Sequence, residues 1–380
     1  MFEQLTVYLI VLALAVAIHY IIPRSRSVWR QLSISAWSTI FLSFISPLVV
    51  IAAIAASILL WLHARYLTWG ANAKRWSWLL TAIAVLAFAL QRLFSDLGAA
   101  DTIGFSYLVI KYIGATWTLK KNEKLRLNSS ILDSFTLLIF FPIFSAGPIE
   151  KLATFNRERF SNAIEFDNFV VGLYRILFGI FKTVFICGTI LSVILNDLRP
   201  EIFSSTSVAW VYVYLNFLLI YFSFSGYTDI AVGSGRLLGL RIAENFRFPL
   251  ISSSVQEFWQ RWHLSLSSFL TEFLFRPLLF QFRGRAAPAI ICAFVIVGLW
   301  HKFSIGYLIW GFGHGFMMII SRDVGRHIQQ TSFFSSRIVI VVKKLIGILF
   351  TLSYVACLSS IANIGDSGQI ALLIKTLFGF

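Results

Sequence analysis

Charged residues are scarce in this 380-residue chain. Asp, Glu, Lys and Arg together supply 13% of it, about half the share that is usual in soluble domains, while hydrophobic residues supply 58%. Apolar segments recur from Leu5 to the C-terminus, and no long polar block separates them. This composition excludes a soluble globular protein. It predicts a polytopic membrane protein whose residues 1–380 form one integral-membrane domain.

Cysteine is also rare. The three cysteines, Cys187, Cys292 and Cys357, lie far apart in apolar runs and form no CxxC pair, so neither a disulfide framework nor a zinc site is predicted. The chain has no Walker A loop and no GxSxG motif, and Ser234 in "VGSGR" lacks the flanking pattern. These absences argue against a P-loop nucleotide site and against a serine nucleophile of the GxSxG type.

No cleavable leader is indicated at the N-terminus. The apolar run Leu5–Ile22 is long enough to cross a membrane, lacks a small-residue cleavage pattern, and is followed by Pro23 and three arginines. We expect a retained helix rather than a signal peptide.

Acidic residues are few: 17 stand against 32 basic ones, for a formal net charge of +15. In a membrane protein, basic clusters mark cytoplasmic loops more often than nucleic-acid binding. The basic clusters are residues 24–30, 65–75, 120–126, 151–159, 236–247, 283–285 and 322–344. The short loops with acidic or few charged residues are 95–101, 196–205 and 363–367. This alternation predicts an outside N-terminus and a basic cytoplasmic face that attracts an acidic partner, with no nucleic acid involved.

Two apolar runs begin and end on the same basic side, so neither is a simple crossing. One is 131–149, where Pro142 and the pair Gly147-Pro148 would break a helix, and the other is 249–282. Broken backbone at membrane depth is tolerated only where protein or water covers it. We therefore expect re-entrant segments around a polar cavity.

The second of these runs has a readable local pattern. Ser254 and Glu257 have the spacing of a capping box, which predicts a helix that begins near Val255, carries an Arg261–Glu257 pair and ends at Pro277. Its expected apolar stripe is Phe258, Trp262, Phe269 and Phe273. On this helix His263 would lie one turn from both Trp259 and Ser267.

Three of the six histidines, His263, His301 and His314, lie in apolar surroundings and are candidates for lining a site. The other three are expected to be structural: His19, His63 and His327. One straight helix would separate His301 from His314 by about 20 Å, which excludes an i, i+4 metal pair and bis-histidine haem ligation. The GxxxG spacings Gly235/Gly239 and Gly311/Gly315 predict close helix packing.

Several of these elements occur together in one known family. The stretch "YFSFSGYTDIAVGSGRLLGLRIAENFRFPLISSSVQEFWQRWHLSLSSFL", the later "GLWH" with "WGFGHG", and the earlier "FFPIFSAGPIEKLATF" stand in the order and spacing of that family's motifs. The chain thus resembles the membrane-bound O-acyltransferase family, in the bacterial branch with alginate O-acetyltransferases and the teichoic acid D-alanyltransferase. The motif-bearing core runs from about residue 103 to 315.

The resemblance implies an all-α membrane fold with about 10–12 transmembrane or re-entrant helices around a central funnel. It places the family's catalytic histidine on His301 and a second histidine on His263. The residues expected to bind substrate or line the tunnel are Asp229, Asn245, Trp259, Trp262, Ser267, Trp300 and His314. The chain departs from the family pattern at Lys302 and at Thr271, Glu272 and Phe273.

The chemistry that the resemblance implies is acyl transfer from a thioester to a hydroxyl, with His301 as general base and His263 fixing its tautomer, polarising the carbonyl or positioning the acceptor. No cofactor is expected to be permanently bound, and no metal. The donor would be an acyl carrier protein or acyl-CoA on the cytoplasmic face. The acceptor would be an envelope polysaccharide, a teichoic-acid-like polymer or a relay protein, with an extracytoplasmic transferase as a further partner.

We expect a multi-pass protein of the bacterial cytoplasmic membrane. Two other classes also accommodate broken helices: a transporter or flippase, and a non-catalytic scaffold of an envelope assembly complex. Inverted-repeat symmetry, or transport without an acyl donor, would favour the transporter. An inactive chain that still organises its partners would favour the scaffold.

Overall fold

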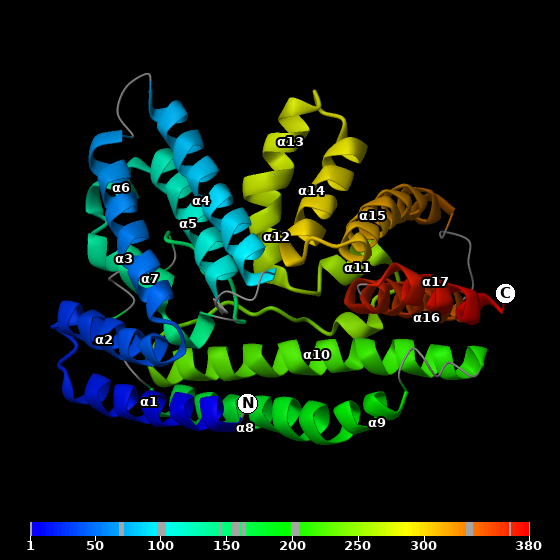
Figure 1. Ribbon diagram of the computed structural model, residues 1–380, viewed down its shortest axis with the longest axis horizontal. Helices are drawn as coiled ribbons and strands as arrows, with labels where there is room; N and C mark the ends of the chain where they lie inside the picture. The colour runs from blue at the N-terminus through cyan, green and yellow to red at the C-terminus, as the bar shows by residue number, and fades with distance from the viewer. Residues whose placement is uncertain are drawn as a thin grey trace. The chain divides into compact units, whose positions relative to one another are not determined.

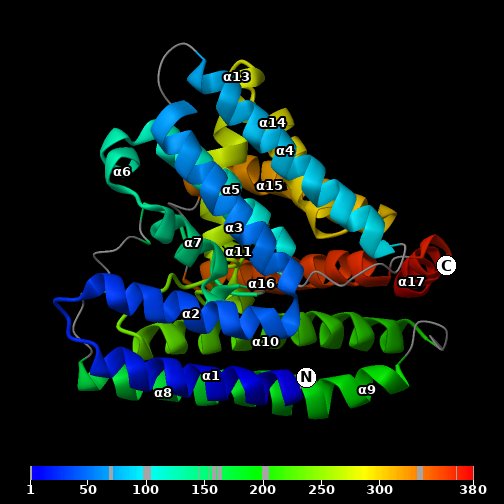
Figure 2. The same ribbon diagram turned by 60° about the vertical axis from the view of Figure 1, so that its left-hand side comes forward.

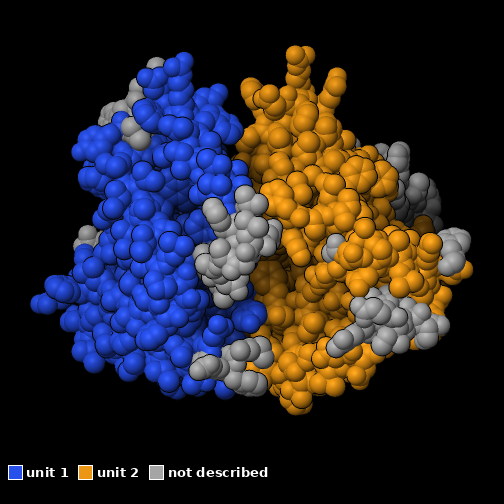
Figure 3. Space-filling view, viewed as in Figure 1, with its two compact units in different colours: residues 1–179, 227–243 blue, residues 180–226, 244–380 orange. Residues whose placement is uncertain are grey.

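The computed structural model describes residues 2–67, 72–96, 104–144, 146–153, 155, 160, 165–198, 205–331, 337–364 and 366–379. These residues form helices joined by turns, with no strand among them, which confirms the all-α prediction (Figure 1). The basic cluster 151–159 and the loops 95–101, 196–205 and 363–367 lie partly outside the described residues. The chain packs as two compact units, coloured separately in Figure 3.

Unit 1 comprises residues 1–179 and 227–243. Its helices are α1 (Phe2–Ile21), α2 (Ser27–Ile45), α3 (Pro47–Leu62) with the π-helical turn η1 (His63–Leu67), α4 (Ala73–Asp96), α5 (Phe105–Lys121), α6 (Glu123–Asn128), α7 (Ile131–Ile139), the 3-10 turn η2 (Phe141–Ile143), α8 (Phe166–Ile180) and the C-terminal part of α10 (Thr206–Leu237). Helices α1 and α2 lie side by side (Figures 1 and 2). Gly172 of α8 and Gly233 of α10 let those two backbones touch: a Cβ at Gly172 would lie 2.9 Å from the Gly233 carbonyl oxygen.

Unit 2 comprises residues 180–226 and 244–380. Its elements are η4 (Phe181–Leu191), α9 (Ser192–Asp197), the N-terminal part of α10, η6 (Pro249–Ile251), α11 (Val255–Trp259), α12 (Leu264–Leu270), η7 (Thr271–Phe275), α13 (Arg276–Gln281), α14 (Ala286–His301), α15 (Ile305–Thr331), α16 (Arg337–Ile364) and α17 (Ser367–Phe378). Helices α14 and α15 form the most extensive helix pair of this unit, and α15 also packs against α16.

Several helices have the length and composition of membrane spans. In the described part of the chain, five pass both criteria: Gln4–Ile21, Pro47–Tyr66, Phe166–Asp197, Thr206–Leu237 and Ile338–Ile364. Most of their side chains are not buried inside the protein, as expected for helices that face lipid. The apolar run at the N-terminus is helical as predicted, because α1 covers Phe2–Ile21.

The predicted break in 131–149 is present. Helix α7 begins with a capping box between Ser130 and Asp133 and ends at Ile139, and Pro142 lies in the short turn η2 that follows. The proline has no amide hydrogen to continue the helix, so the backbone turns here. The carbonyls released by this break are bonded by Lys111, described below.

The run 249–282 differs from its prediction in two ways. Helix α11 begins at Val255 as expected, but it stops at Trp259, and a new helix begins after His263. Pro277 does not end the helix: α13 continues through it to Gln281, directly after the π-helical turn η7. A widened turn before a proline lets the helix accommodate a residue without an amide hydrogen.

The two GxxxG spacings have different roles. The predicted close packing is found at Gly311 and Gly315 of α15, where added Cβ atoms would meet the backbone of α14 at 2.5 and 3.1 Å. Gly239 instead follows the end of α10 with φ 71°, a left-handed conformation that glycine adopts most easily, and Gly235 packs on Ile242 of the same turn. That pair therefore terminates a helix rather than joining two helices.

Candidate functional site

His263 lies in a turn of unit 2, outside every candidate span. Its backbone has φ 46° and ψ 54°, a left-handed conformation that is uncommon for a residue with a side chain. Two hydrogen bonds hold the turn against a neighbouring extended segment: Arg247 N donates to Arg261 O at 2.9 Å, and Leu264 N donates to Asn245 O at 3.0 Å. Such strain persists only where the surroundings enforce it, and it is concentrated at functional sites.

Asn245 fixes the proton on the His263 ring. Its side-chain oxygen accepts from the Ser265 hydroxyl at 2.6 Å and from the Ser265 amide at 3.3 Å, so it acts as an acceptor. His263 Nδ1 lies 3.3 Å from the same oxygen and therefore carries the hydrogen. The other ring nitrogen, Nε2, is left with a lone pair.

Aromatic rings surround this turn. Phe224 contacts the His263 ring edge-to-face at 4.6 Å, and Trp262 stacks on Phe258 at 5.2 Å. Phe246 in turn packs edge-on against Trp262 at 5.0 Å. Residue His263 is 4% exposed. A charged imidazolium is poorly solvated in such surroundings.

Burial, and next the positive charge of His301, lower the pKa of His263 from 6.5 to about 3. The ring is therefore neutral at physiological pH. A positive charge on His301 thus acts on the His263 ring, and both histidines belong to unit 2.

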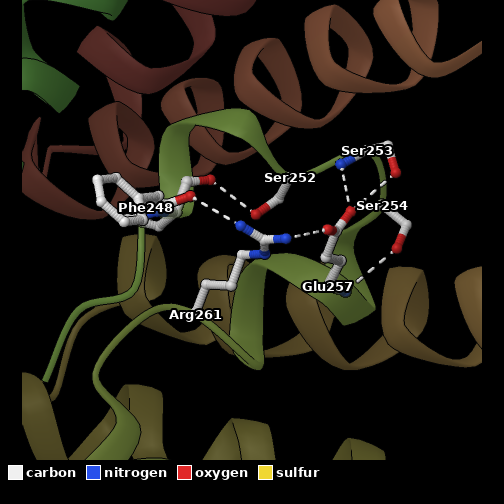
Figure 4. Close-up of polar contacts among 7 residues, drawn as sticks. Phe248, Ser252, Ser253, Ser254, Glu257 and Arg261 are labelled. Carbon is white, nitrogen blue, oxygen red and sulfur yellow. Dashed lines mark hydrogen bonds and ion pairs between the residues drawn. The ribbon is translucent and has the colours of Figure 1, made fainter. Parts of the chain in front are cut away.

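A polar scaffold holds the turn from outside (Figure 4). The Ser254 hydroxyl accepts from Glu257 N at 3.1 Å, as the capping pattern predicts, while the Glu257 carboxylate accepts from the amide and the hydroxyl of Ser253. Arg261 pairs with Glu257 at 2.7 Å and reaches Phe248 O at 3.5 Å. Burial opposes ionisation of Glu257, but the Ser253 hydrogen bonds and Arg261 outweigh it and lower its pKa. The ionised carboxylate thus links Ser253 to Arg261 and stabilises the turn.

His301 is the last residue of α14 and is only partly buried. Its ring contacts those of Trp300 at 4.6 Å, Tyr307 at 5.7 Å and Trp310 at 5.7 Å. One turn earlier, a Cβ at Gly298 would collide with the Tyr307 carbonyl, so this glycine brings the end of α14 against α15. The C-terminal end of a helix favours positive charge, and His301 lies at such an end.

His314 is 1% exposed and has a different environment. Its Nδ1 accepts from the Trp259 indole at 3.2 Å, and Trp310 lies between it and His301, with ring centroids 4.6 and 5.7 Å away. Ser267, one turn beyond His263, donates to Trp259 O at 3.3 Å. His314 therefore anchors Trp259 and is separated from His301 by a tryptophan.

A cavity of about 580 Å³ lies within unit 2 beside Trp259. It is lined by two of the residues predicted to bind substrate, Trp259 and Ser267, and by two residues that depart from the family pattern, Thr271 and Glu272. Sequence reasoning missed its remaining polar residues, Gln256, Gln260, Ser268 and Arg276. All four come from the segment α11–α13 and line the cavity together with residues of α14. The sequence does not predict that they share one face, because this depends on the helix break at His263.

Asp229 lies in unit 1, on the C-terminal part of α10, where it pairs with Arg175 Nε at 2.7 Å. No pattern in the sequence pointed to Arg175 as its partner. Within the described residues, no cluster of three His, Cys, Asp or Glu side chains has the arrangement of a metal site.

Comparison with known proteins agrees with this architecture. Residues 27–361 match the membrane-bound O-acyltransferase family. The chain is 30% identical over 259 residues to a probable alginate O-acetylase, AlgI, of Pseudomonas syringae pv. tomato, covering 67% of this chain and 48% of that protein. It is 30% identical over 220 residues to a peptidoglycan O-acetyltransferase of Helicobacter pylori, covering 54% of this chain and 40% of that protein.

A third relative is a teichoic acid D-alanyltransferase of Bacillus subtilis, 28% identical over 232 residues, which cover 57% of this chain and 58% of that protein. The chain thus spans about half the length of the curated relatives it matches. The family match nevertheless covers both histidines and most of the chain on either side of them. This chain belongs to the membrane-bound O-acyltransferase family.

Proposed function

We propose that this protein transfers an acyl group, of the acetyl or D-alanyl type, from a cytosolic thioester to a hydroxyl of an extracytoplasmic envelope polymer or relay protein. The observation that carries the proposal is the pairing, in one unit, of two histidines with opposite surroundings. His263 is buried and neutral, whereas His301 is partly exposed at a helix C-terminus. The acetyl- and D-alanyltransferases among the relatives support this reaction class.

His301 is the proposed base. The hydroxyl oxygen attacks the thioester carbonyl carbon while the His301 ring takes the hydroxyl proton. The carbon–sulfur bond then breaks, and the proton passes to the departing thiolate, which leaves an ester and a free thiol. The position at the end of α14 supports this role, because the helix dipole stabilises the imidazolium that forms.

His263 is the proposed positioning residue for the acceptor. With Nδ1–H directed at Asn245, its Nε2 lone pair is an acceptor for a second hydroxyl of the acceptor molecule, because the single proton of the attacking hydroxyl goes to His301. A neutral ring in an aromatic enclosure orients the acceptor in this way without competing for the proton that is transferred. The residues of unit 2 proposed to line or support the substrate path are Asn245, Trp259, Trp262, Ser267, Trp300 and His314, while a role for Asp229 of unit 1 stays a prediction from the family motif.

The donor is proposed to be an acyl carrier protein or acyl-CoA on a basic cytoplasmic face, with no permanently bound cofactor. The protein would lie in the bacterial cytoplasmic membrane with its N-terminus outside. Its acceptor would be an envelope polysaccharide or a teichoic-acid-like polymer, and an extracytoplasmic transferase would complete the transfer where the acyl group is relayed.

The test uses purified protein in nanodiscs with radiolabelled acetyl-CoA or, separately, D-alanyl carrier protein, and envelope extract as acceptor. We expect one donor to be consumed and His301→Ala to lower acyl transfer by about 10²–10⁴-fold, the contribution of a general base. His327→Ala, which changes a histidine expected to be structural, is the matched control.

Equal rates for His301→Ala and wild type would refute the assignment of the base. If wild type consumes neither donor, the acyltransferase proposal fails. Polymer movement across the bilayer without donor would then favour a transporter, and partner assembly without turnover would favour a scaffold.

A further inference from the structure

Four segments of unit 1 bring basic residues to one end of a helix group. They are the turn η1, the start of α4, the end of α5 and the short helix α6 (Figures 1 and 2). Turn η1 contacts α4, α5 and α6, and α5 contacts both α4 and α6. Residues from separate loops therefore form one surface.

This surface is strongly positive. Its exposed or half-buried cations are Arg65, Lys74, Arg75, Lys120, Lys121 and Lys124, while the neighbouring Arg126 is buried. The stretches 63–67, 72–78 and 117–126 contain a single carboxylate, Glu123, which pairs with Arg126 at 3.1 Å. Lys74 and Lys121 lie close enough to Lys120 for their like charges to act on its ammonium group. Clustered cations with so little negative charge among them favour an anionic ligand.

Aromatic side chains stand among these cations. Tyr66 is 68% exposed and Trp78 is 52% exposed. Trp78 packs edge-on against Trp117 at 5.1 Å, and the Lys120 ammonium lies 4.9 Å above the Trp117 ring. Exposed Trp and Tyr next to Lys and Arg are typical of the headgroup level of a membrane.

A candidate membrane span indicates where this surface lies relative to the bilayer. Residues 47–66 form one of the long apolar helices, and that span ends at Tyr66, inside the surface itself. The cations are therefore at the level where lipid phosphates lie, with apolar helix directly below them. A soluble acidic partner would have no need of exposed indole rings at this depth.

We propose that this basic–aromatic surface of unit 1, formed by Arg65, Lys74, Lys120, Lys121, Trp78 and Trp117, binds the headgroups of anionic phospholipids in the adjacent leaflet. Lysine and arginine pair with the phosphates, and the indole rings pack against the glycerol and upper acyl region. This inference involves none of the site residues, but it assigns to lipid two of the basic clusters that form the predicted cytoplasmic face.

The experiment measures lipid retention by native mass spectrometry of the full chain in detergent, after addition of equal amounts of phosphatidylglycerol and phosphatidylcholine. Wild type should retain phosphatidylglycerol preferentially. The variant K74Q/K120Q/K121Q should lose that preference about tenfold or more, because each surface cation contributes to the attraction. R283Q/R285Q, which neutralises exposed arginines of unit 2, should retain it.

Two further measurements keep the proposal falsifiable if the triple variant folds poorly. K74R/K120R/K121R should bind like wild type, and wild-type retention should fall as salt rises. Undiminished retention in K74Q/K120Q/K121Q would overturn the proposal. So would complete competition by inorganic phosphate, which indicates a free-anion site, or loss of carrier-protein binding with lipid retention intact, which indicates a protein-docking surface.

Discussion

The two broken helices of this protein are closed in opposite ways. In unit 1, the break after α7 is filled by Lys111, which is 2% exposed and donates to Leu137 O at 3.3 Å and to Ile143 O at 3.2 Å. In unit 2, the break after α11 is bonded by Asn245, which fixes one nitrogen of His263 and leaves the other as an acceptor. The first break is thus closed by the amine of a buried lysine, whereas the second presents a histidine nitrogen that can accept a hydrogen bond.

Of changes at the two breaks, the larger loss of turnover is expected where the second break is disturbed. Asn245→Leu keeps the volume but removes the acceptor for His263 and Ser265. The ring then loses its fixed tautomer, and we expect acyl transfer to fall by about 10–100-fold, the cost of losing an orienting partner of a functional histidine. The readout is donor turnover in nanodiscs beside a thermal unfolding curve. A variant with full turnover would show that the Asn245 contact is only structural.

A change at the break in unit 1 should lower the stability of the folded protein. Lys111→Met leaves the Leu137 and Ile143 carbonyls without this donor, which costs about 1–3 kcal/mol for each buried acceptor. Thermal unfolding in detergent should show a markedly lower midpoint, while turnover per folded molecule stays near the wild-type value. Loss of turnover at unchanged stability would contradict the contrast between the two breaks.

A smaller effect is expected where α14 meets α15. Gly298→Ala places a methyl group against the Tyr307 carbonyl, which must move the end of α14 that carries His301. We expect destabilisation of about 1–3 kcal/mol, as for overpacking in a core, with reduced turnover. Gly368→Ala adds the same methyl group near the start of α17, where its one close neighbour is an Asp366 side-chain oxygen at 3.1 Å, and it should be neutral. Equal behaviour of the two variants would refute a tight α14–α15 contact.

The smallest effect is a pH dependence of stability. In the unfolded chain His263 becomes protonated as the pH falls below its ordinary pKa of 6.5. In the folded chain it becomes protonated only when the pH approaches its lowered pKa of about 3. Stability from this group is therefore complete above pH 6.5 and declines by about 1.4 kcal/mol for each pH unit below it. His263→Asn should flatten the fall of the unfolding midpoint between pH 6.5 and 5. An unchanged slope would indicate that His263 is protonated in the folded protein.

The first helix break could be predicted from the sequence, but the position of the second could not, because only the first has a local cause. Pro142 ends a helix by its own chemistry, so the break after α7 follows from the sequence. The break at His263 depends on pairing with residues 245–247, a contact between distant positions that no local pattern records. For the same reason the capping of α11 by Ser254 was predictable, while its end at Trp259 and the passage of α13 through Pro277 were not.

The site shows the same division. Motif order identified His263, His301 and Asn245, and the structure brings these three into unit 2. Trp310, which lies between His301 and His314, and the cavity residue Arg276 came only from helix packing. Residue type and spacing thus locate the candidates, and tertiary contacts decide which of them share a site.

The most direct test of the central claim is the protonation state of His263 in the folded protein. We would record nitrogen-15 spectra of histidine-labelled protein in nanodiscs between pH 5 and 8, and assign the His263 signals by their loss in His263→Asn. The structure predicts a neutral ring with the hydrogen on Nδ1 throughout this range. An imidazolium at pH 6, or a neutral ring with the hydrogen on Nε2, would contradict the division of roles between His263 and His301.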